Sequence, residues 1–189
     1  MIGIDEVGRG CWAGPLLVVS ARKIKPLPKE LKDSKLLSRT KREAMFEKLI
    51  LSCQFGEGWV TVSEIDKLGL AEALKRGVAR SLSELDTELN EQIIMDGSVN
   101  YAPVKFTKSK CIINADNSVP IVSAASVYAK VLRDRYMTRL ARKYPKYRFE
   151  KHVGYGTSAH ISALKHYGVI DGIHRKSYKP IRAVLGDNS

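Results

Sequence analysis

The sequence predicts one α/β domain built on a mixed β-sheet. Short apolar runs typical of buried strands alternate with segments at helical spacing, in the order strand, strand, helix, strand, helix, strand, strand, helix, helix. The chain has 189 residues, 44% of them hydrophobic, which is enough for one sizeable core. No internal repeat or linker divides it. We therefore expect a single domain over residues 1–189, with a C-terminal helical appendage over about 150–189.

The first half contributes two strands, a helix and a third strand. A glycine-rich turn separates two apolar runs that suit a buried hairpin. Thr40 is a candidate N-cap for the next helix, and Ser63 is a candidate cap for a later one. The expected elements are strands over 2–7 and 16–19, a helix over 40–52 and a strand over 55–62.

The second half begins with a helix whose apolar residues recur at helical spacing. Two short apolar runs then end in acidic turns, and a long helix follows until Pro145 stops it. The expected elements are a helix over 70–85, strands over 93–95 and 111–113, and helices over 122–143 and 158–167. The tail after Gly168 reads as irregular.

The charge balance indicates a polyanionic partner. The formal net charge is +12, which makes nucleic acid the first candidate and an anionic membrane surface the second. No apolar run is long enough to span a membrane, and the first residues do not resemble a signal peptide. Three widely spaced cysteines form neither a disulfide framework nor a zinc pattern, so a cytoplasmic location is expected.

Four carboxylates stand at the ends of predicted strands. Asp5 and Glu6 interrupt an apolar strand pattern, while Asp96 and Asp116 follow the two short strands. Oxygen ligands select Mg²⁺ or Mn²⁺ over zinc, and a pair of such ions suits in-line phosphoryl transfer. A metal-dependent nuclease is therefore favoured. For Asp96, which precedes Gly97, a turn role is an equal alternative.

Six ordered motifs resemble those of type 2 ribonucleases H, most closely the ribonuclease HII family. The resemblance covers nearly the whole chain. The matching segments are Gly3 to Gly10 with Ala13-Gly14-Pro15, Asp33-Ser34-Lys35 with Leu37-Ser38, Ile94 to Gly97, Ala115-Asp116 with the helix from Ser123 to Asp134, His152 to Thr157 with His160, and His174 to Ser177.

The resemblance implies a ribonuclease H-like fold and an endoribonuclease. Its substrates would be RNA–DNA hybrids and DNA duplexes that contain single ribonucleotides, with cleavage on the 5′ side of the ribonucleotide. Asp5, Glu6, Asp96 and Asp116 would bind the catalytic metals, Mg²⁺ or Mn²⁺. The residues implied in substrate binding are Gly8, Arg9 and Gly10 at the ribonucleotide, Tyr155 on the next deoxyribose, and Lys35, Ser126 and Lys130 at phosphates.

The chemistry of these residues agrees with those roles. Only the 2′-OH distinguishes RNA from DNA at one position, and glycine allows a backbone to approach a sugar closely. A tyrosine packed flat on a deoxyribose would clash with a 2′-OH there, which selects DNA on the 3′ side. For Lys130, an exposed polar helix face is an equal alternative to phosphate binding.

The chain departs from the family pattern at a few positions. Ser98 stands where the family has Asn, and Cys11-Trp12 replaces Pro-Leu, which we expect to be a packing change. Residues 181–189 lack the Gln-plus-aromatic motif by which some relatives bind sliding clamps, so no clamp partner is expected. We expect a monomer without membrane contact.

Other polar groups receive secondary interpretations. Asp134 is a candidate extra carboxylate of the site, but arginines surround it in the sequence, so a local ion pair is favoured over metal binding. The four histidines are expected to be structural. A basic run with interleaved tyrosines, from Arg133 to Lys151, is the best candidate for a surface that tracks a nucleic-acid backbone.

Two other functions remain open from the residues alone. A junction resolvase-like nuclease of the same fold would share the acidic cluster but would have no use for a 2′-OH reader. A non-catalytic binder of RNA–DNA hybrids would gain affinity by losing carboxylates beside phosphate.

Overall fold

The protein is built on one five-stranded mixed sheet. The computed structural model describes residues 1–31 and 37–186. The strand order is β3-β2-β1-β4-β5, with β1 antiparallel to β2 and parallel to β4. The strands are β1 (Ile2–Val7), β2 (Leu16–Lys23), β3 (Cys53–Val60), β4 (Ile93–Asp96) and β5 (Ser109–Ile112). The predicted mixed α/β architecture is confirmed.

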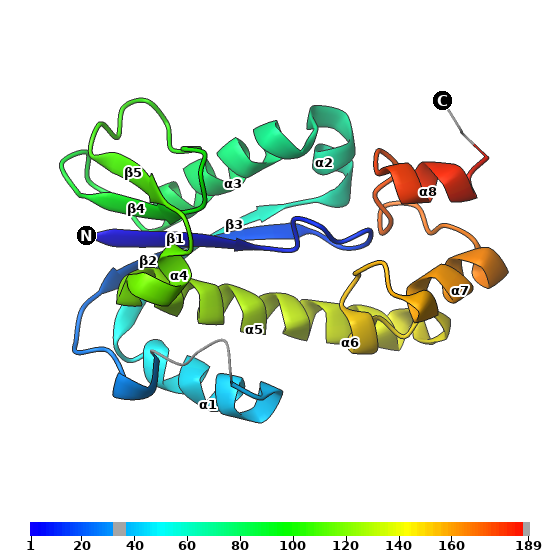
Figure 1. Cartoon of the computed structure of the whole chain (residues 1–189), viewed down its shortest axis with the longest axis horizontal. Helices are drawn as coiled ribbons and strands as arrows, with labels where there is room; N and C mark the ends of the chain where they lie inside the picture. The colour runs from blue at the N-terminus through cyan, green and yellow to red at the C-terminus, as the bar shows by residue number, and fades with distance from the viewer. Residues whose placement is uncertain (32–36, 187–189) are drawn as a thin grey trace.

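Helices cover both faces of this sheet. Figure 1 shows α2 and α3 above it and α5, with α1 beyond, below it. The helices are α1 (Arg39–Leu49), α2 (Val62–Leu68), α3 (Leu70–Glu84), α4 (Ala115–Ser118), α5 (Pro120–Lys143), α6 (Phe149–His152), α7 (Ser158–Tyr167) and α8 (Lys179–Val184), with a 3₁₀ turn, η2, at Pro145–Tyr147. No helix in the described ranges is long and apolar enough to cross a membrane.

The alternation of side chains along β2 explains the two layers. Leu16 and Val18 pack into the core cluster that α3 shares, while Leu17 and Val19 pack into the cluster that α5 shares. Successive strand residues point to opposite faces, so an apolar run without polar breaks serves both. The strand therefore reads as a continuous hydrophobic segment because neither of its faces meets water.

Helix α5 runs directly along β1. A Cβ atom at Gly3 would lie 2.5 Å from the backbone carbon of Ile121, so only glycine permits this approach. Ala124 and Ala125 continue the small-residue contact surface and are fully buried. Asp5 shares the strand face of Gly3 because it lies two residues further along, so its side chain faces α5.

Several element boundaries differ from the prediction. Ser38, not Thr40, caps α1 and accepts a hydrogen bond from the Lys41 N–H. Thr61 and Glu64 form a reciprocal capping box at α2, a helix that was not predicted, so Ser63 is not the cap. The prediction of an irregular tail was also wrong, because Pro180 lies at the start of α8, where a helix needs no N–H donor.

The C-terminal elements gather at one end of the sheet. Figure 1 shows α6, α7 and α8 together beyond the turn between β1 and β2. A backbone bridge joins Ala13 in that turn to His174, and the Gly14 N–H donates to the Ile173 carbonyl at 2.8 Å. The C-terminal segment thus packs directly against the glycine-rich turn.

Candidate active site

The parallel pairing of β1 and β4 brings predicted site residues together. Ile4 is in register with Met95, so Asp5 and Asp96 both follow that pair at one edge of the sheet. Electrostatic coupling links Asp5, Glu6 and Asp96. Three carboxylates from two neighbouring strands therefore share one site.

Burial raises the pKa of Asp5 to about 7. The loss of hydration is the main cause, and the charges of Glu6 and Asp96 raise it further, while a hydrogen bond from Ser126 opposes the shift. Burial also raises the pKa of Glu6, although the Arg9 guanidinium, 3.7 Å away, opposes this. The site concentrates negative charge that the surrounding protein compensates only in part.

Asp96 connects the cluster to α4, the helix that carries Asp116. The Asp96 carboxylate accepts a hydrogen bond of 2.7 Å from the Ala115 N–H, at the first turn of that helix. Asp116 is the next residue and is buried. Asp116 therefore directly follows the residue whose N–H binds Asp96.

The donor set fits a hard divalent cation. The side chains of the cluster offer carboxylate oxygens, which Mg²⁺ and Mn²⁺ prefer. A cation beside Asp5 would offset the desolvation and repulsion that raise its pKa. Within the described residues, no group of three or more His, Cys, Asp or Glu side chains is placed so that it could hold a metal ion.

The glycine-rich turn after β1 contains two glycines with different roles. Gly8 has a φ of +92°, and a Cβ atom there would lie 2.3 Å from Nε of Arg133, so the fold itself requires glycine. A Cβ atom at Gly10 would meet nothing within 4 Å. Packing against the described residues therefore does not explain glycine at position 10.

Tyr155 lies beside this turn and is 44% exposed. Its hydroxyl interacts with the thiol of Cys11, and burial raises the pKa of both groups. Trp12 lies against Gly156, where a Cβ atom would come 2.1 Å from the indole ring. The two residues that depart from the family pattern, Cys11 and Trp12, thus pack against the loop that carries Tyr155, as the predicted packing change requires.

The structure shows the surroundings of two of the three predicted phosphate-binding residues. Ser126 lies at the acidic cluster, where it donates to Asp5. Lys130 forms an ion pair with Asp134 one helical turn later, so Asp134 pairs with this lysine rather than with the expected arginine. Lys35 lies outside the described residues.

Two buried arginines form a part of the site that the sequence analysis missed. Arg133 is fully buried and donates to the carbonyls of Ala13, Pro15 and Val153. Arg175 is fully buried as well, and its guanidinium binds carbonyls of the glycine-rich turn. Both side chains fix backbone rather than phosphate, so Arg133 is removed from the predicted basic surface.

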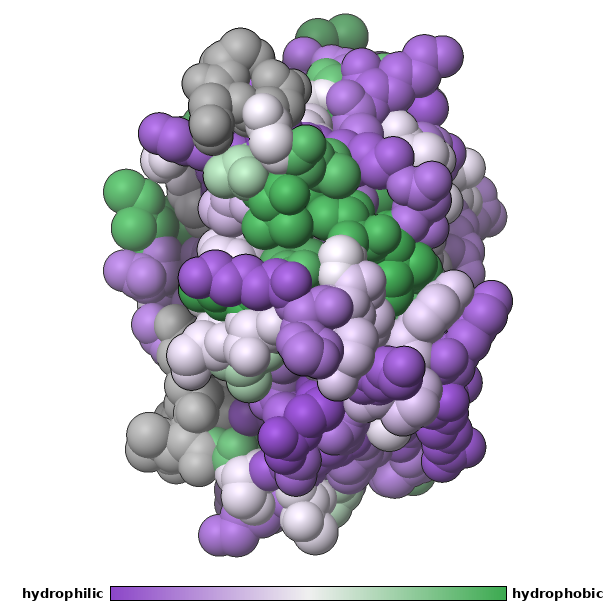
Figure 2. All heavy atoms as spheres, turned by 90° about the vertical axis from the view of Figure 1, so that its right-hand side faces the viewer, coloured by the Kyte–Doolittle hydropathy of each residue, from purple (hydrophilic) through white to green (hydrophobic). Residues whose placement is uncertain are grey.

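Some residues of the predicted basic surface are held or buried within the protein, and others are exposed. Arg135 is held by Glu43 and Glu47, and Tyr147 is buried. Figure 2 shows hydrophilic side chains over the lower part of the face that includes the end of α5 and α6. The basic side chains exposed in this region are Arg139, Arg142, Lys143, Lys146, Arg148 and Lys151.

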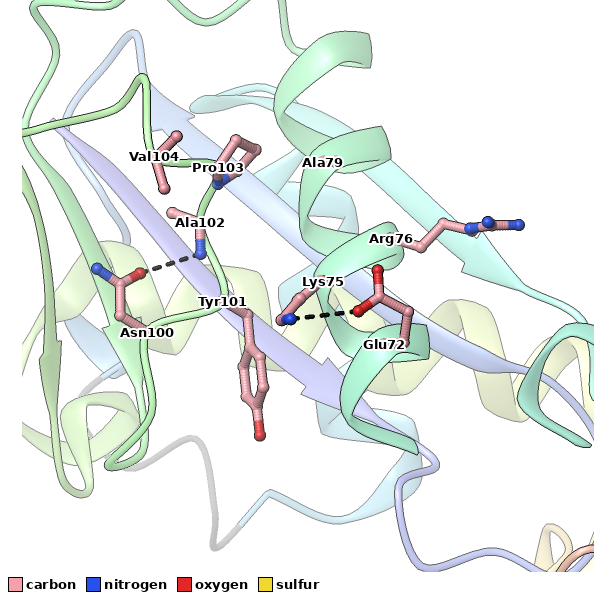
Figure 3. A pocket seen from close by; sticks show the side chains of 9 residues that line it. All are labelled: Glu72, Lys75, Arg76, Ala79, Asn100, Tyr101, Ala102, Pro103 and Val104. Carbon is pink, nitrogen blue, oxygen red and sulfur yellow. Dashed lines mark hydrogen bonds and ion pairs between the residues drawn. The ribbon is translucent and has the colours of Figure 1, made fainter. Parts of the chain in front are cut away.

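A pocket of about 520 Å³ lies elsewhere, between α3 and the loop that joins β4 to β5 (Figure 3). Its two cationic side chains already have partners, because Lys75 pairs with Glu72 at 3.2 Å and Arg76 with Glu64 at 3.1 Å. No predicted site residue lines it. This pocket is separate from the carboxylate cluster.

Comparison with known proteins identifies the family. The family model "Ribonuclease HII" matches residues 2–181. Ribonuclease HII of Geobacillus sp. (strain WCH70) is 38% identical over 97% of this chain and 65% of the relative, and that of Coxiella burnetii (strain Dugway 5J108-111) is 38% identical over 95% of this chain and 88% of the relative. The chain thus spans slightly less than two thirds of the Geobacillus protein.

Solved structures agree with the sequence relatives. RNase HII of Archaeoglobus fulgidus, solved in complex with PCNA, has a TM-score of 0.77 and 27% identity, covering 93% of this chain and 92% of the other. Ribonuclease H2 of Pyrococcus horikoshii has a TM-score of 0.75 and 27% identity, covering 98% and 96%. Fold and sequence therefore agree that the chain belongs to the ribonuclease HII family, the type 2 ribonucleases H.

Proposed function

We propose that this chain cuts the RNA strand of RNA–DNA hybrids and cuts duplex DNA on the 5′ side of single embedded ribonucleotides, leaving 3′-OH and 5′-phosphate ends. Family membership supports the first activity and its dependence on a divalent metal. The observation that carries the proposal is the adjacency of three coupled carboxylates, Asp5, Glu6 and Asp96, to a turn with an open glycine face at Gly10.

The carboxylates are proposed to hold the metals and to set the catalytic position. Asp5, Glu6, Asp96 and Asp116 would bind two Mg²⁺ or Mn²⁺ ions. When bound, such ions supply positive charge that activates a water molecule and stabilises the leaving oxygen. The hydrogen bond from the Ala115 N–H fixes the orientation of the Asp96 carboxylate. The hydrogen bond from Ser126 fixes that of Asp5.

The glycine-rich turn and Tyr155 are proposed to read the sugars. Gly8, Arg9 and Gly10 would approach the ribose through their backbone, which the open space at Gly10 permits. Tyr155, exposed and beside the same turn, would stack on the following deoxyribose. A 2′-OH on that second sugar would clash with the ring.

The remaining groups are proposed to bind phosphates. Lys130 would do so from α5, where its ammonium pairs with Asp134, and Ser126, which interacts with Asp5, would offer a hydroxyl. Lys35 is proposed for the same role from the family resemblance alone. The exposed basic side chains from Arg139 to Lys151 would follow the duplex backbone. The protein would act as a monomer in the cytoplasm.

One cleavage assay tests these proposals together. A DNA duplex with one ribonucleotide, an RNA–DNA hybrid and an all-DNA branched junction are incubated with the protein in Mg²⁺, Mn²⁺ or EDTA. Cleavage of the first two substrates, only with metal, is expected. Cleavage of the all-DNA junction would instead favour a resolvase, and binding without cleavage would favour a hybrid binder.

Substitution of Asp96 separates metal binding from substrate binding. Asp96→Asn removes a proposed ligand charge and also weakens repulsion of phosphate, so cleavage should be nearly abolished while duplex affinity stays equal or rises. Glu91→Gln, two residues before β4, where Glu91 pairs with Arg22, is a control in the same region. Wild-type turnover by Asp96→Asn at saturating Mg²⁺ would remove Asp96 from the site.

A further inference from the structure

We propose that the Tyr178 hydroxyl positions the Arg9–Gly10 peptide for recognition of the ribose. In this inference, Tyr178 and Arg175 hold the Arg9 carbonyl so that the Gly10 N–H faces the substrate. The inference rests on the proposed function, since it concerns the same glycine-rich turn.

The Arg9 carbonyl is the centre of a small hydrogen-bond network. The Tyr178 hydroxyl donates to it at 2.6 Å, and Nη1 of Arg175 donates to it at 3.1 Å. The same Nη1 donates to the Tyr178 oxygen at 2.8 Å. A hydroxyl that accepts from a guanidinium is a stronger donor, so the contact from Tyr178 to Arg9 is strengthened.

Two donors on one carbonyl fix the orientation of the whole peptide unit. A trans peptide is planar, and its C=O and N–H groups point in opposite directions. Because the Arg9 carbonyl points towards Tyr178, the Gly10 N–H points away from the C-terminal segment. No acceptor within the described part of the chain binds that N–H.

Gly10 itself lies on an open part of the surface. It is exposed, and a Cβ atom built there would meet no described residue within 4 Å. An exposed N–H that has no partner among residues 1–31 and 37–186 suits a hydroxyl acceptor of the substrate. The 2′-OH is the group that distinguishes ribose from deoxyribose.

The segment that carries Tyr178 is itself held in place on both sides. The Asp66 carboxylate, from α2, accepts from the backbone N–H groups of Lys176 and Ser177, both at 2.9 Å. On the other side, the Arg175 N–H donates to the Trp12 carbonyl at 2.8 Å. Tyr178 therefore acts from a rigid support rather than from a free tail.

A binding comparison tests this role. Affinity is measured in EDTA for a duplex with one ribonucleotide and for the all-DNA duplex of the same sequence, so that no cleavage occurs. Tyr178→Phe keeps the ring and removes only the hydroxyl. We expect the preference for the ribonucleotide duplex to fall about three- to tenfold, with the all-DNA affinity unchanged.

Tyr147→Phe is the matched control. The Tyr147 hydroxyl also donates to backbone carbonyls, those of Tyr167 and Gly168, but far along the chain from the glycine-rich turn. Its removal should leave the preference unchanged. Asp66→Asn, which loosens the support of Tyr178 without touching the hydroxyl, should lower the preference in the same direction.

The outcomes separate this inference from the proposed function. If wild-type protein shows no preference for the ribonucleotide duplex, the proposed reading of single ribonucleotides is overturned, and this inference with it. If wild-type protein shows the preference and Tyr178→Phe keeps it, or loses affinity for both duplexes equally, only the positioning role is overturned. Melting curves of each variant report whether the fold is intact.

Discussion

The Nε2 atoms of His160 and His174 lie 3.2 Å apart in the interior of the protein. The Ile170 N–H donates to Nδ1 of His174, so the proton of neutral His174 is on Nε2, from which it donates to His160. His160 then carries its own proton on Nδ1 and donates to the Tyr155 carbonyl at 3.0 Å. The chain of bonds ends on the backbone of a proposed sugar-reading residue, and these histidines have the structural role expected from the sequence.

This pair predicts acid sensitivity. Burial lowers the pKa values of His160 and His174 to about 4, while in the unfolded chain they remain near 6.5. The unfolded state therefore binds more protons below pH 6.5, and stability falls as pH decreases from 6.5 to 4. At pH 5 the loss is roughly 2 kcal/mol per histidine.

The measurement is the free energy of unfolding in urea between pH 4.5 and 8. We expect His160→Gln to lower stability at pH 8 and to flatten the dependence on pH. His166 is exposed on α7, and His166→Gln should leave the dependence unchanged. A wild-type free energy that stays level down to pH 4.5 would contradict the assigned neutral tautomers.

Removal of the Asp5 charge should stabilise the metal-free protein. The pKa of Asp5 is raised to about 7, mainly by burial, so the protonated carboxyl favours the folded state and this advantage is lost as pH rises through 7. In EDTA at pH 8, Asp5→Asn should melt roughly 4–8 °C above wild type, corresponding to about 2 kcal/mol.

Two comparisons control this prediction. The difference should be smaller at pH 5, where wild-type Asp5 is protonated, and saturating Mg²⁺ should raise the wild-type melting temperature more than that of the variant. Asp134→Asn removes the partner of Lys130 and should give no such gain. An Asp5 variant that melts below wild type in EDTA at pH 8 would contradict the charge argument.

Alanine at the two glycines of the turn should act on different properties. Gly8→Ala meets a positive φ and the Arg133 side chain, so it should destabilise the fold by about 1–3 kcal/mol. Gly10→Ala projects a methyl group into open space, so its melting temperature should equal that of wild type. Its kcat/KM on a single ribonucleotide should fall on the order of tenfold, because the methyl group occupies the place proposed for the sugar.

The exposed basic surface should determine the salt dependence of binding. Each phosphate contact contributes roughly 0.9 to the slope of log K against log[salt], so charge reversal of Arg142 and Lys146 should lower the slope by roughly 2. Charge reversal of Lys75 and Arg76 changes the net charge equally but lies on α3, on the opposite face of the sheet from α5. An unchanged slope in the first double variant would place the nucleic-acid surface elsewhere.

Sequence patterns located the strand ends of the site because the local signal there is strong. Ile93, Ile94 and Met95 form a buried run that ends at Asp96, and the acidic Asp5 interrupts a similar run. Apolar runs of this length indicate buried strands whatever the rest of the chain does. The parallel pairing that brings Asp5 and Asp96 to one edge then follows from the fold class.

The buried arginines could not be predicted in the same way. Arginine is almost always solvent-exposed, so Arg133 reads as one member of a basic run and Arg175 as part of a polar tail. Their acceptors include the carbonyls of Ala13, Gly14 and Pro15, more than a hundred residues away in the chain. Contacts of this kind depend on where a distant loop lies in the folded protein. The hydrophobic pattern of the sequence does not show this.

The last prediction concerns Tyr155, whose ring is exposed beside the glycine-rich turn. Tyr155→Ala removes a stacking surface worth roughly 1–3 kcal/mol, by analogy with base–aromatic stacking. It leaves Asp5, Glu6 and Asp96 unchanged, so metal-dependent stabilisation should be retained. A duplex with one ribonucleotide has a deoxyribose on its 3′ side, whereas a long hybrid has another ribose there. We therefore expect kcat/KM to fall far more on the first substrate than on the second.

The control is Tyr167→Ala, which changes an exposed tyrosine at the end of α7 and should lower kcat/KM on both substrates equally or on neither. Equal losses on both substrates for Tyr155→Ala would make Tyr155 a general binding or structural residue, and Tyr155→Phe, which keeps the ring but not the hydroxyl near Cys11, would then show which part of the side chain matters.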